Sequence, residues 1–583
     1  MAIHNADIAA VFEEMADLLE IEGANPFRVR AYRNAARTLR GLGREVSDLI
    51  ARGEDLTDLP GIGRDLAAKI EEMLATGKVK ALRKLKREVP ESLEALLNIP
   101  GLGPKRVKVL HEELGINTLG QLAKAARDGR LCALAGFGAK TEANILEAVG
   151  AGRAAGRRFL RAEVESVAER LLGYVRSAPG VEQAALAGSF RRERETVGDL
   201  DILIAADDGP VVMDRFVEFP DVDRVVSRGT TRSTVVLRGG LQVDLRVVAR
   251  ESYGAALHYF TGSKSHNIAI RRLGQQAGLK INEYGVFAGE RRIAGETEAS
   301  VFKSLGLPYI EPVLREDRGE IDAARRYRLP ALIVRADLRG DFHAHTDAGG
   351  GAGSLEDMAA AARVAGLDYL AITDDSRRLG RSPGRRAERL LAQGEAIDRL
   401  NDRLSGLTLL KGVEVDVQED GELGLPDAIL ARLDLVVAAV HDEGRLSRKR
   451  QTERILRAMD HAHVSLLAHP AGRLLLEREG YDVDMERVID RAAKCGCLLE
   501  INSQPRRLDL DEHWCRIAKE RGARLCINSD ARGPEQFAML RYGVDQARRG
   551  WLEPGDVLNT RGLREVRSWL ARAREADAPC AGV

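Results

Sequence analysis

The chain has 583 residues, 44% hydrophobic and 31% charged, and its 89 basic and 89 acidic residues cancel to zero net charge. At about 150 residues per domain, this length indicates three or four domains. The composition is that of an ordinary globular protein and excludes a disordered or fibrous chain. Zero net charge leaves nucleic-acid binding to local patches such as the basic run over residues 78–87, a pattern also typical of a solvated helix face.

The six cysteines form no Cys-x-x-Cys pair, which favours a reducing cytoplasm with buried thiols. The N-terminus carries acidic residues by position 7 and lacks the apolar core of a signal peptide. No apolar run approaches the roughly 18 residues of a membrane span. We therefore expect a cytoplasmic protein that has no membrane among its partners.

An internal repeat marks the first 150 residues, where apolar residues recur at helical spacing. A glycine–hydrophobe–glycine turn occurs three times, each before a helical segment that begins near Asp65, Lys105 or Lys140. Such a turn presents backbone N–H groups at a positive helix end, which suits a DNA phosphate without reading bases. A single copy also simply caps a helix. The repeat predicts DNA contacts at Gly61, Gly63, Gly101, Gly103, Gly136 and Gly138.

Two carboxylates at the head of an apolar strand dominate residues 155–325. Asp199 and Asp201 precede an apolar run over residues 202–205, and alternate strand residues face the same side of a sheet. The preceding turn, residues 188–192, is small and cationic, which suits a phosphate. An isolated Asp-x-Asp is also typical of a polar strand end. The turn and the acid pair together favour a divalent metal beside a phosphate.

A third acid, Asp244, lies in a second strand-like alternation over residues 241–248. An adjacent strand would bring it beside Asp199 and Asp201. Three carboxylates can hold two Mg²⁺ ions about 3.5–4 Å apart, the arrangement for in-line displacement at phosphorus. Further along, the charged residues 315–328 predict a helical connector that ends before Pro330.

Residues 335–575 alternate apolar strands with helical stretches, as a βα-repeat does. In a (β/α) barrel the carboxyl ends of the strands converge on one mouth, where the active site lies. A single histidine at a strand end is usually structural, but many metal-binding residues in register indicate a multi-metal hydrolytic site. The candidate ligands are His343, His345, Asp375, Glu414, His441, His469 and Asp530.

The middle region resembles the family X DNA polymerases of the polymerase β type, and the last region resembles the PHP phosphoesterase domain. Together with the helix-hairpin-helix N-terminus, the polymerase resemblance spans most of residues 1–325. The whole order resembles a bacterial family X polymerase with a fused PHP domain. The polymerase motifs are Gly188-Ser189, Arg192, Gly198-Asp199-x-Asp201, Asp244, Tyr259-Phe260-Thr261-Gly262, Asn267, Arg271 and Ile281-Asn282-Glu283-Tyr284.

The resemblance implies a multidomain α+β and α/β chain. It would combine a helical helix-hairpin-helix N-terminus, a nucleotidyltransferase-type palm with a thumb, and a C-terminal PHP (β/α) barrel. The implied divisions are a lyase-like DNA-end-binding domain (1–90), a helix-hairpin-helix region (91–154), the palm and adjoining subdomain (155–316), a linker (317–336) and the PHP domain (337–583).

The resemblance also implies roles for single residues. Asp199, Asp201 and Asp244 would hold Mg²⁺ or Mn²⁺, with Asp244 beside the ion that activates the primer 3′-hydroxyl. Lys69 matches the Schiff-base lysine that removes 5′-deoxyribose phosphate, although a phosphate-facing or solvated lysine is the alternative. Glu193 stands where the family has glycine. The implied phosphate contacts are Gly188, Ser189, Arg192 and Gly198; Tyr259, Phe260 and Gly262 would line the sugar pocket, Asn267 would face the incoming base, and Arg271 the template.

Three positions of the last region depart from the PHP pattern. Gly350 replaces an aspartate, Asp375 replaces a histidine, and Arg532 replaces the closing histidine. In the resembling family these positions group around one of three metals. We therefore hypothesise a site that keeps two metals, Mn²⁺ or Zn²⁺, with the charge of Arg532 where the third would lie.

These features predict a DNA-directed DNA polymerase that fills short gaps in DNA repair, with a PHP domain that supports 3′→5′ exonuclease activity. The expected partners are gapped or primed DNA and deoxynucleoside triphosphates, and the expected state is a cytoplasmic, nucleoid-associated monomer. Two alternatives remain open: a PHP phosphoesterase that acts on small phosphate esters, and a DNA-binding module with an inactive PHP domain.

Overall fold

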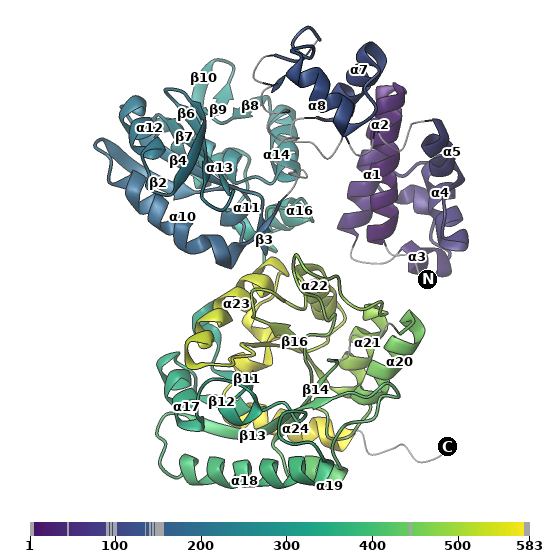
Figure 1. Cartoon of the computed structure of the whole chain (residues 1–583), viewed down its shortest axis with the longest axis vertical. Helices are drawn as coiled ribbons and strands as arrows, with labels where there is room; N and C mark the ends of the chain where they lie inside the picture. Colours follow the sequence, from purple (N-terminus) through teal and green to yellow (C-terminus); the bar gives the residue numbers. More distant parts are fainter. Residues whose placement is uncertain are drawn as a thin grey trace. The chain divides into compact units, whose positions relative to one another are not determined.

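A computed structural model describes residues 5–42, 46–88, 93, 96, 102–134, 136–138, 141–142, 145, 157–441 and 446–576. The chain forms two compact units, Met1–Arg157 and Arg158–Val583. No described helix has the length and apolar character needed to cross a membrane. Figure 1 labels many of the elements of both units.

The first unit is helical, and its described residues share one apolar core. Helix α4 shows why the sequence folds locally as it does. Gly63 is its N-cap, Gly77 ends it in the left-handed conformation (φ 71°), and Leu66, Ile70 and Met73 bury one face. The helices are α1 (Asn5–Glu22), α2 (Pro26–Gly41), α3 (Val46–Ala51), α4 (Arg64–Thr76), α5 (Lys80–Glu88), α7 (Pro104–Leu114) and α8 (Leu119–Arg127).

The second unit begins with a five-stranded mixed sheet in the order β2-β4-β7-β6-β5. Helices α10 and α12 pack on one face of this sheet, whereas α13 packs on the other against β4. The bounds are β1 (Phe159–Leu160), α10 (Arg161–Arg176), β2 (Val181–Leu186), α11 (Gly188–Arg191), β3 (Thr196–Val197), β4 (Asp199–Ala206), α12 (Gly209–Val217), β5 (Val222–Arg228), β6 (Arg232–Leu237), β7 (Gln242–Val248) and α13 (Tyr253–Thr261).

A small three-stranded antiparallel sheet follows, flanked by short helices. The predicted helical connector over residues 315–328 is confirmed only for α16. Asp317 and Gly319 adopt positive φ and delay the helix start, and Arg315 is fully buried rather than solvated. The elements are α14 (Lys264–Gln276), β8 (Leu279–Asn282), β9 (Gly285–Ala288), β10 (Arg291–Ala294), α15 (Glu298–Ser304) and α16 (Glu320–Arg325).

The rest of the chain is a parallel seven-stranded sheet in sequence order, β11 to β17. The sheet nearly closes into a barrel, because Ala344 at the end of β11 bridges Ala531 beyond β17. The strands are β11 (Gly340–Ala344), β12 (Tyr369–Ile372), β13 (Thr408–Asp416), β14 (Leu435–Ala439), β15 (Leu466–Leu467), β16 (Leu498–Asn502) and β17 (Leu525–Asn528).

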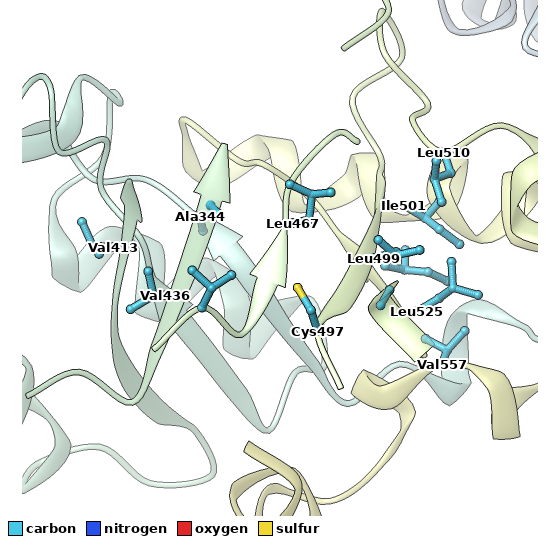
Figure 2. Packing of buried hydrophobic residues seen from close by; sticks show 14 of the residues in the cluster. Ala344, Val413, Val436, Leu467, Cys497, Leu499, Ile501, Leu510, Leu525 and Val557 are labelled. Carbon is cyan, nitrogen blue, oxygen red and sulfur yellow. The ribbon is translucent and has the colours of Figure 1, made fainter. Parts of the chain in front are cut away.

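Alternate residues of the barrel strands belong to two apolar cores. Leu370 and Ile372 join the core shared with the surrounding helices, part of which is drawn in Figure 2, whereas Tyr369 and Ala371 join a second core that includes α24. Burial on both faces explains why these strands read as continuous apolar runs. The helices are α17 (Leu355–Val364), α18 (Pro383–Asn401), α19 (Asp427–Leu430), α20 (Arg448–Met459), α21 (Met485–Cys495), α22 (Glu512–Glu520), α23 (Leu540–Arg549) and α24 (Leu563–Ala576).

Candidate functional site

The three predicted carboxylates meet on neighbouring strands. Asp199 and Asp201 open β4, and Asp244 lies on its parallel neighbour β7, directly paired with Asp201 in register. Asp199 and Asp201 face the side of the sheet that carries α13, since Leu203 and Ala205 of the same alternation pack against that helix. The predicted strand adjacency is therefore present.

The electrostatics of these three carboxylates favours a bound cation. Burial, followed by repulsion from Asp199 and Asp244, raises the pKa of Asp201 to about 7. The pKa of Asp199 is also raised, first by burial and then by Asp244. Because a divalent cation would relieve this repulsion, the three residues fit a metal site.

Asp244 is held by its own neighbours. Its Oδ1 accepts hydrogen bonds from the Thr234 hydroxyl (2.6 Å) and from Arg232 (3.0 Å), and its Oδ2 accepts one from Gln242 (2.9 Å). In the described parts of the chain, two groups of residues bring their ligand atoms within 4.8 Å of one another, and this carboxylate trio is not one of them.

The turn before β4 lies directly against Asp201. Gly188 adopts φ 59°, and a Cβ on it would lie 2.2 Å from Oδ2 of Asp201, so glycine is required twice over. Ser189 follows it on α11, and Gly198 immediately precedes β4. Arg192 donates to the Thr261 carbonyl (2.5 Å) and to Glu316 (3.0 Å), which ties the turn to α13 and to residues before α16.

The predicted nucleoside pocket lies at the end of α13 and on α14. The rings of Tyr259 and Phe260 meet edge to face at 5.2 Å. Asn267 donates to the Tyr259 carbonyl (2.7 Å), and the guanidinium of Arg271 lies 6.0 Å from the Tyr259 ring. Gly262 follows at φ 71°. These five residues thus form one cluster, and Gly262 lies against Arg192 of the turn.

The barrel strands bring six of the predicted ligands into two groups. Each group places its ligand atoms within 4.8 Å, and Glu414 of β13 lies between them. Its Oε1 is 3.4 Å from Nε2 of His343, and its Oε2 is 3.8 Å from Nε2 of His345. The groups are His343, His345 and Asp530, and Glu414, His441 and His469.

Charges within the barrel centre balance one another. Burial alone would lower the pKa of His343, but Glu500, Asp530 and Glu414 raise it well above its usual value. Burial would likewise raise the pKa of Glu414, yet His343 and the other imidazoles hold it well below its usual range. His343 and Glu414 therefore stabilise each other's charge, whereas the carboxylate trio contains no cationic partner.

Two observations fit this centre to metal ions. Nε2 of His343 and Oε2 of Glu414 are buried and have no hydrogen-bond partner among the described residues. His469 and Asp530 hold the left-handed conformation at φ 31° and 47°, a strain that clusters at functional sites. Imidazole and carboxylate together suit Mn²⁺ or Zn²⁺.

Models of known families match four stretches of the chain. They describe a helix-hairpin-helix domain (residues 3–79), a SAM-like helix-hairpin-helix tandem (93–151), a DNA polymerase beta palm (158–247) and a DNA polymerase beta thumb (256–316). The chain is also 37% identical over 577 residues to the DNA polymerase/3′-5′ exonuclease PolX of Bacillus subtilis. The alignment covers 98% of this chain and 100% of that protein.

The chain belongs to the family X DNA polymerases that carry a PHP domain. Two partial relatives match parts of it. DNA polymerase lambda of Rattus norvegicus is 28% identical over 54% of this chain and 56% of its own length. A probable phosphatase of Thermoanaerobacter is 33% identical over 38% of this chain and 89% of its own length. The predicted resemblance and fold class are therefore confirmed.

In the helix-hairpin-helix unit, Gly61 and Gly136 occupy the same place in their turns and share positive φ (79° and 85°). Gly63 and Gly103 are the N-caps of α4 and α7, and among the described residues no side chain caps either helix. A Cβ on Gly63, Gly103 or Gly138 would meet nothing within 4 Å, so these turns leave room for a phosphate. Gly101 lies outside the described residues.

Lys69 lies on α4 with a mostly buried side chain. Its amine forms an ion pair with Asp65 one helical turn earlier and lies 6.0 Å from the Tyr32 ring. A lysine that attacks an aldehyde needs a free amine, so Lys69 would have to leave its ion pair with Asp65.

The altered PHP positions are surrounded by guanidinium groups. Asp375, which we predicted as a metal ligand, lies outside both ligand groups, because Arg377 engages both its oxygens (3.1 and 2.8 Å). Gly350 packs beneath Arg378, and a Cβ there would lie 2.5 Å from its Cδ. Arg532 lies 3.5 Å from Asp530.

Sequence reasoning missed the residues that orient the ligands. Nδ1 of His343 pairs with Glu500 (2.7 Å), and Nδ1 of His441 pairs with Asp416 (3.1 Å). Such carboxylates hold the orientation of a metal-binding imidazole. The signal was present for Glu500, a single acid inside the apolar strand β16. Nothing local marked Thr234 and Arg232, since they reach Asp244 only by strand pairing.

Proposed function

We propose that this chain is a DNA-directed DNA polymerase that fills short gaps in DNA repair by nucleotidyl transfer. The observation that carries the proposal is the carboxylate trio of β4 and β7, with the turn at Gly188 packed directly against Asp201. The names of two relatives, PolX and DNA polymerase lambda, support the same reaction.

The candidate site residues of the palm each have a proposed part in nucleotidyl transfer. Asp199, Asp201 and Asp244 would hold Mg²⁺ or Mn²⁺, which when bound lowers the pKa of the primer 3′-hydroxyl and neutralises charge on the triphosphate. Gly188, Ser189, Arg192 and Gly198 bind the β and γ phosphates. Backbone N–H groups and a guanidinium there stabilise the charge that builds on the leaving pyrophosphate.

The end of α13 and the face of α14 select the nucleotide. Tyr259, Phe260 and Gly262 line the sugar and exclude a ribose 2′-hydroxyl, because two aromatic rings leave little room there. Asn267 faces the incoming base and Arg271 the template.

A primer-extension assay on gapped DNA, with Mg²⁺ or Mn²⁺ and with or without deoxynucleoside triphosphates, tests this proposal. Asp199→Ala should abolish nucleotide addition while DNA binding stays near normal. Asp207→Ala, at an exposed acid just beyond the same strand, is the matched control and should extend normally. Persistent extension by Asp199→Ala would exclude the assigned site.

For the barrel we propose a metal-dependent 3′→5′ exonuclease centre that holds two ions, Mn²⁺ or Zn²⁺, through the two ligand groups around Glu414. The relative PolX of Bacillus subtilis, a DNA polymerase/3′-5′ exonuclease by name, supports the activity. The guanidinium groups of Arg377, Arg378 and Arg532 support two ions rather than three, because fixed positive charges surround the altered positions. Metal analysis of the full-length double variant Asp199→Ala/Asp201→Ala, which lacks two of the palm ligands, should find two tightly bound ions; three would contradict this part.

His343→Ala should stop removal of 3′ nucleotides and leave polymerisation intact. One rival is a phosphoesterase acting on small phosphate esters, which the probable-phosphatase relative favours. Turnover of small esters without degradation of 3′ DNA ends would support it. If the wild-type chain neither turns over small esters nor degrades 3′ DNA ends, the barrel is inactive.

The helix-hairpin-helix unit is proposed to bind DNA phosphates through the glycine turns that open α4 and α7, in keeping with their uncapped N-termini. Lyase chemistry at Lys69 is a secondary proposal. Borohydride trapping on DNA with a 5′-deoxyribose phosphate should cross-link the wild-type chain and not Lys69→Ala. A cytoplasmic, nucleoid-associated monomer completes the proposal, and sedimentation of the purified chain tests the monomer.

A further inference from the structure

The turn that follows β2 is held by the barrel as well as by the palm. The guanidinium of Arg549, at the end of α23, donates to the main-chain carbonyl of Arg192 (2.6 Å), across 357 residues of sequence. Arg549 is buried and also bonds Glu512 of α22 (3.0 Å) and Glu316 (3.3 Å). A C-terminal helix thereby contacts the backbone of a residue proposed to bind triphosphate.

The side chain of Arg192 belongs to the same network. The Oε1 atom of Glu316 accepts from Nε of Arg192 (3.0 Å) and from Arg549 (3.3 Å). One carboxylate oxygen therefore holds both guanidinium groups. Because this oxygen is nearly buried, the position of Arg192 depends on Arg549 through both its main chain and its side chain.

Two acids that directly follow the turn make the charges of the barrel important for a triphosphate bound at the turn. Glu193 and Glu195 lie within three residues of Arg192, and uncompensated carboxylates there would repel a triphosphate. Arg548 of α23 lies 3.4 Å from Glu193, and Arg473 forms an ion pair with Glu195. Gln546 of α23 also donates to Glu195 (2.8 Å). Arg548, Arg473 and Gln546 of the barrel therefore contact these acids, and Arg161 of α10 in the palm also offsets the charge of Glu193.

We propose that helix α23 of the barrel positions the triphosphate-binding turn of the palm, with Arg549 as the positioning residue for Arg192 and Arg548 as the counter-charge for Glu193. This inference rests on the proposed nucleotidyl transfer. It gives the barrel a second role that is independent of its own metal centre.

Single-nucleotide addition on primed DNA, with separate kcat and KM for the deoxynucleoside triphosphate, tests the proposal in the full-length chain. Arg549→Met should raise this KM at least about tenfold, the equivalent of one lost charge-assisted hydrogen bond. Arg549→Lys should recover part of the loss. The matched control is Arg454→Met, another buried arginine of the barrel, which bonds only main-chain carbonyls of residues 417 and 418 in the described contacts. It should leave KM unchanged, even if Tm falls.

A milder pair keeps the test decisive if Arg549→Met fails to fold. Above pH 7, where Glu193 is ionised, Arg548→Gln should raise KM by exposing the charge of Glu193, and the double variant Glu193→Gln/Arg548→Gln should restore it. A loss caused only by damaged packing would not be rescued in this way. Unchanged KM in Arg549→Met, or in Arg548→Gln, would overturn the positioning role while the wild-type chain still polymerises. Absence of nucleotide addition by the wild-type chain would instead overturn the proposed function.

Discussion

In the palm, three carboxylates face one another with no imidazole among them, and burial with mutual repulsion raises the pKa of Asp201 to about 7. In the barrel, two acids lie among four histidines, and Glu414 and Asp530 have lowered pKa values although they are more deeply buried than Asp201, because imidazoles offset the burial. The palm carboxylates therefore have no cationic partner within their own group, whereas the barrel acids have imidazoles beside them. The tolerance of each site to substitution should differ accordingly.

The largest effect should come from Gly188→Ala, which tests how tightly the palm site is built. The new Cβ would lie 2.2 Å from the Asp201 carboxylate, and the backbone at φ 59° disfavours alanine. We expect nucleotide addition to fall about 100-fold or more, because an ångström of misplacement is enough for such a loss, and nuclease activity to persist. Gly173→Ala, in an uncrowded stretch of α10, is the control and should retain both activities. If Gly188→Ala added nucleotides at the normal rate, the turn would be able to shift away from Asp201 without loss of activity.

Glu500→Gln should have the next largest effect, this time on the barrel alone. The substitution removes the carboxylate that accepts from Nδ1 of His343 and from the His469 amide (both 2.7 Å). Loss of such an orienting partner typically costs about 10- to 100-fold in activity or metal affinity. Degradation of single-stranded DNA and bound metal should both decrease, while primer extension does not change. The exposed Glu520→Gln serves as the control, and equal nuclease activity in the two variants would contradict the role of Glu500.

Asp416→Asn should weaken the same centre less, by up to about tenfold. Asp416 is less buried than Glu500 and supports only His441, which Glu414 also contacts at 3.1 Å. Nuclease rates of the two variants, measured side by side, rank the two orienting carboxylates. If Asp416→Asn lost more nuclease activity than Glu500→Gln, the orientation of His441 would matter more for catalysis than that of His343.

The smallest effect should be a pH-dependent change in stability at the contact between palm and barrel. Burial, and then repulsion from Asp545, raises the pKa of Glu193 from 4.5 to about 7, although Arg548, Arg161 and Arg549 act in the opposite direction. A carboxyl with a raised pKa in the folded chain destabilises it as pH rises from 4.5 through 7. Glu193→Gln should therefore raise Tm above pH 7 and match the wild-type chain below pH 4.5. A difference in Tm that does not depend on pH would reject this account.

Much of both sites could be predicted because their ligands lie at strand ends. Asp199 and Asp201 head an apolar alternation, and His343, His441 and His469 each lie in or just after a buried strand, so local periodicity was enough. The ion pair of Asp375 with Arg377, which accompanies its place outside both ligand groups, could not be predicted, since it depends on how the following loop turns back. The hydrogen bonds that hold Asp244 also could not be predicted, because Thr234 and Arg232 reach it from β6, the strand that pairs with β7.

The sequence by itself determined the order of the helix-hairpin-helix, polymerase and barrel regions and the strands that carry the candidate ligands, because these depend on residue type and short-range periodicity. Only the tertiary structure decided which groups surround those ligands. Arg549 and Arg192 are 357 residues apart, and no local pattern predicts that α23 meets the phosphate turn. Long-range burial of opposite charges fixes that contact, and with it the turn on which nucleotide binding is proposed to depend.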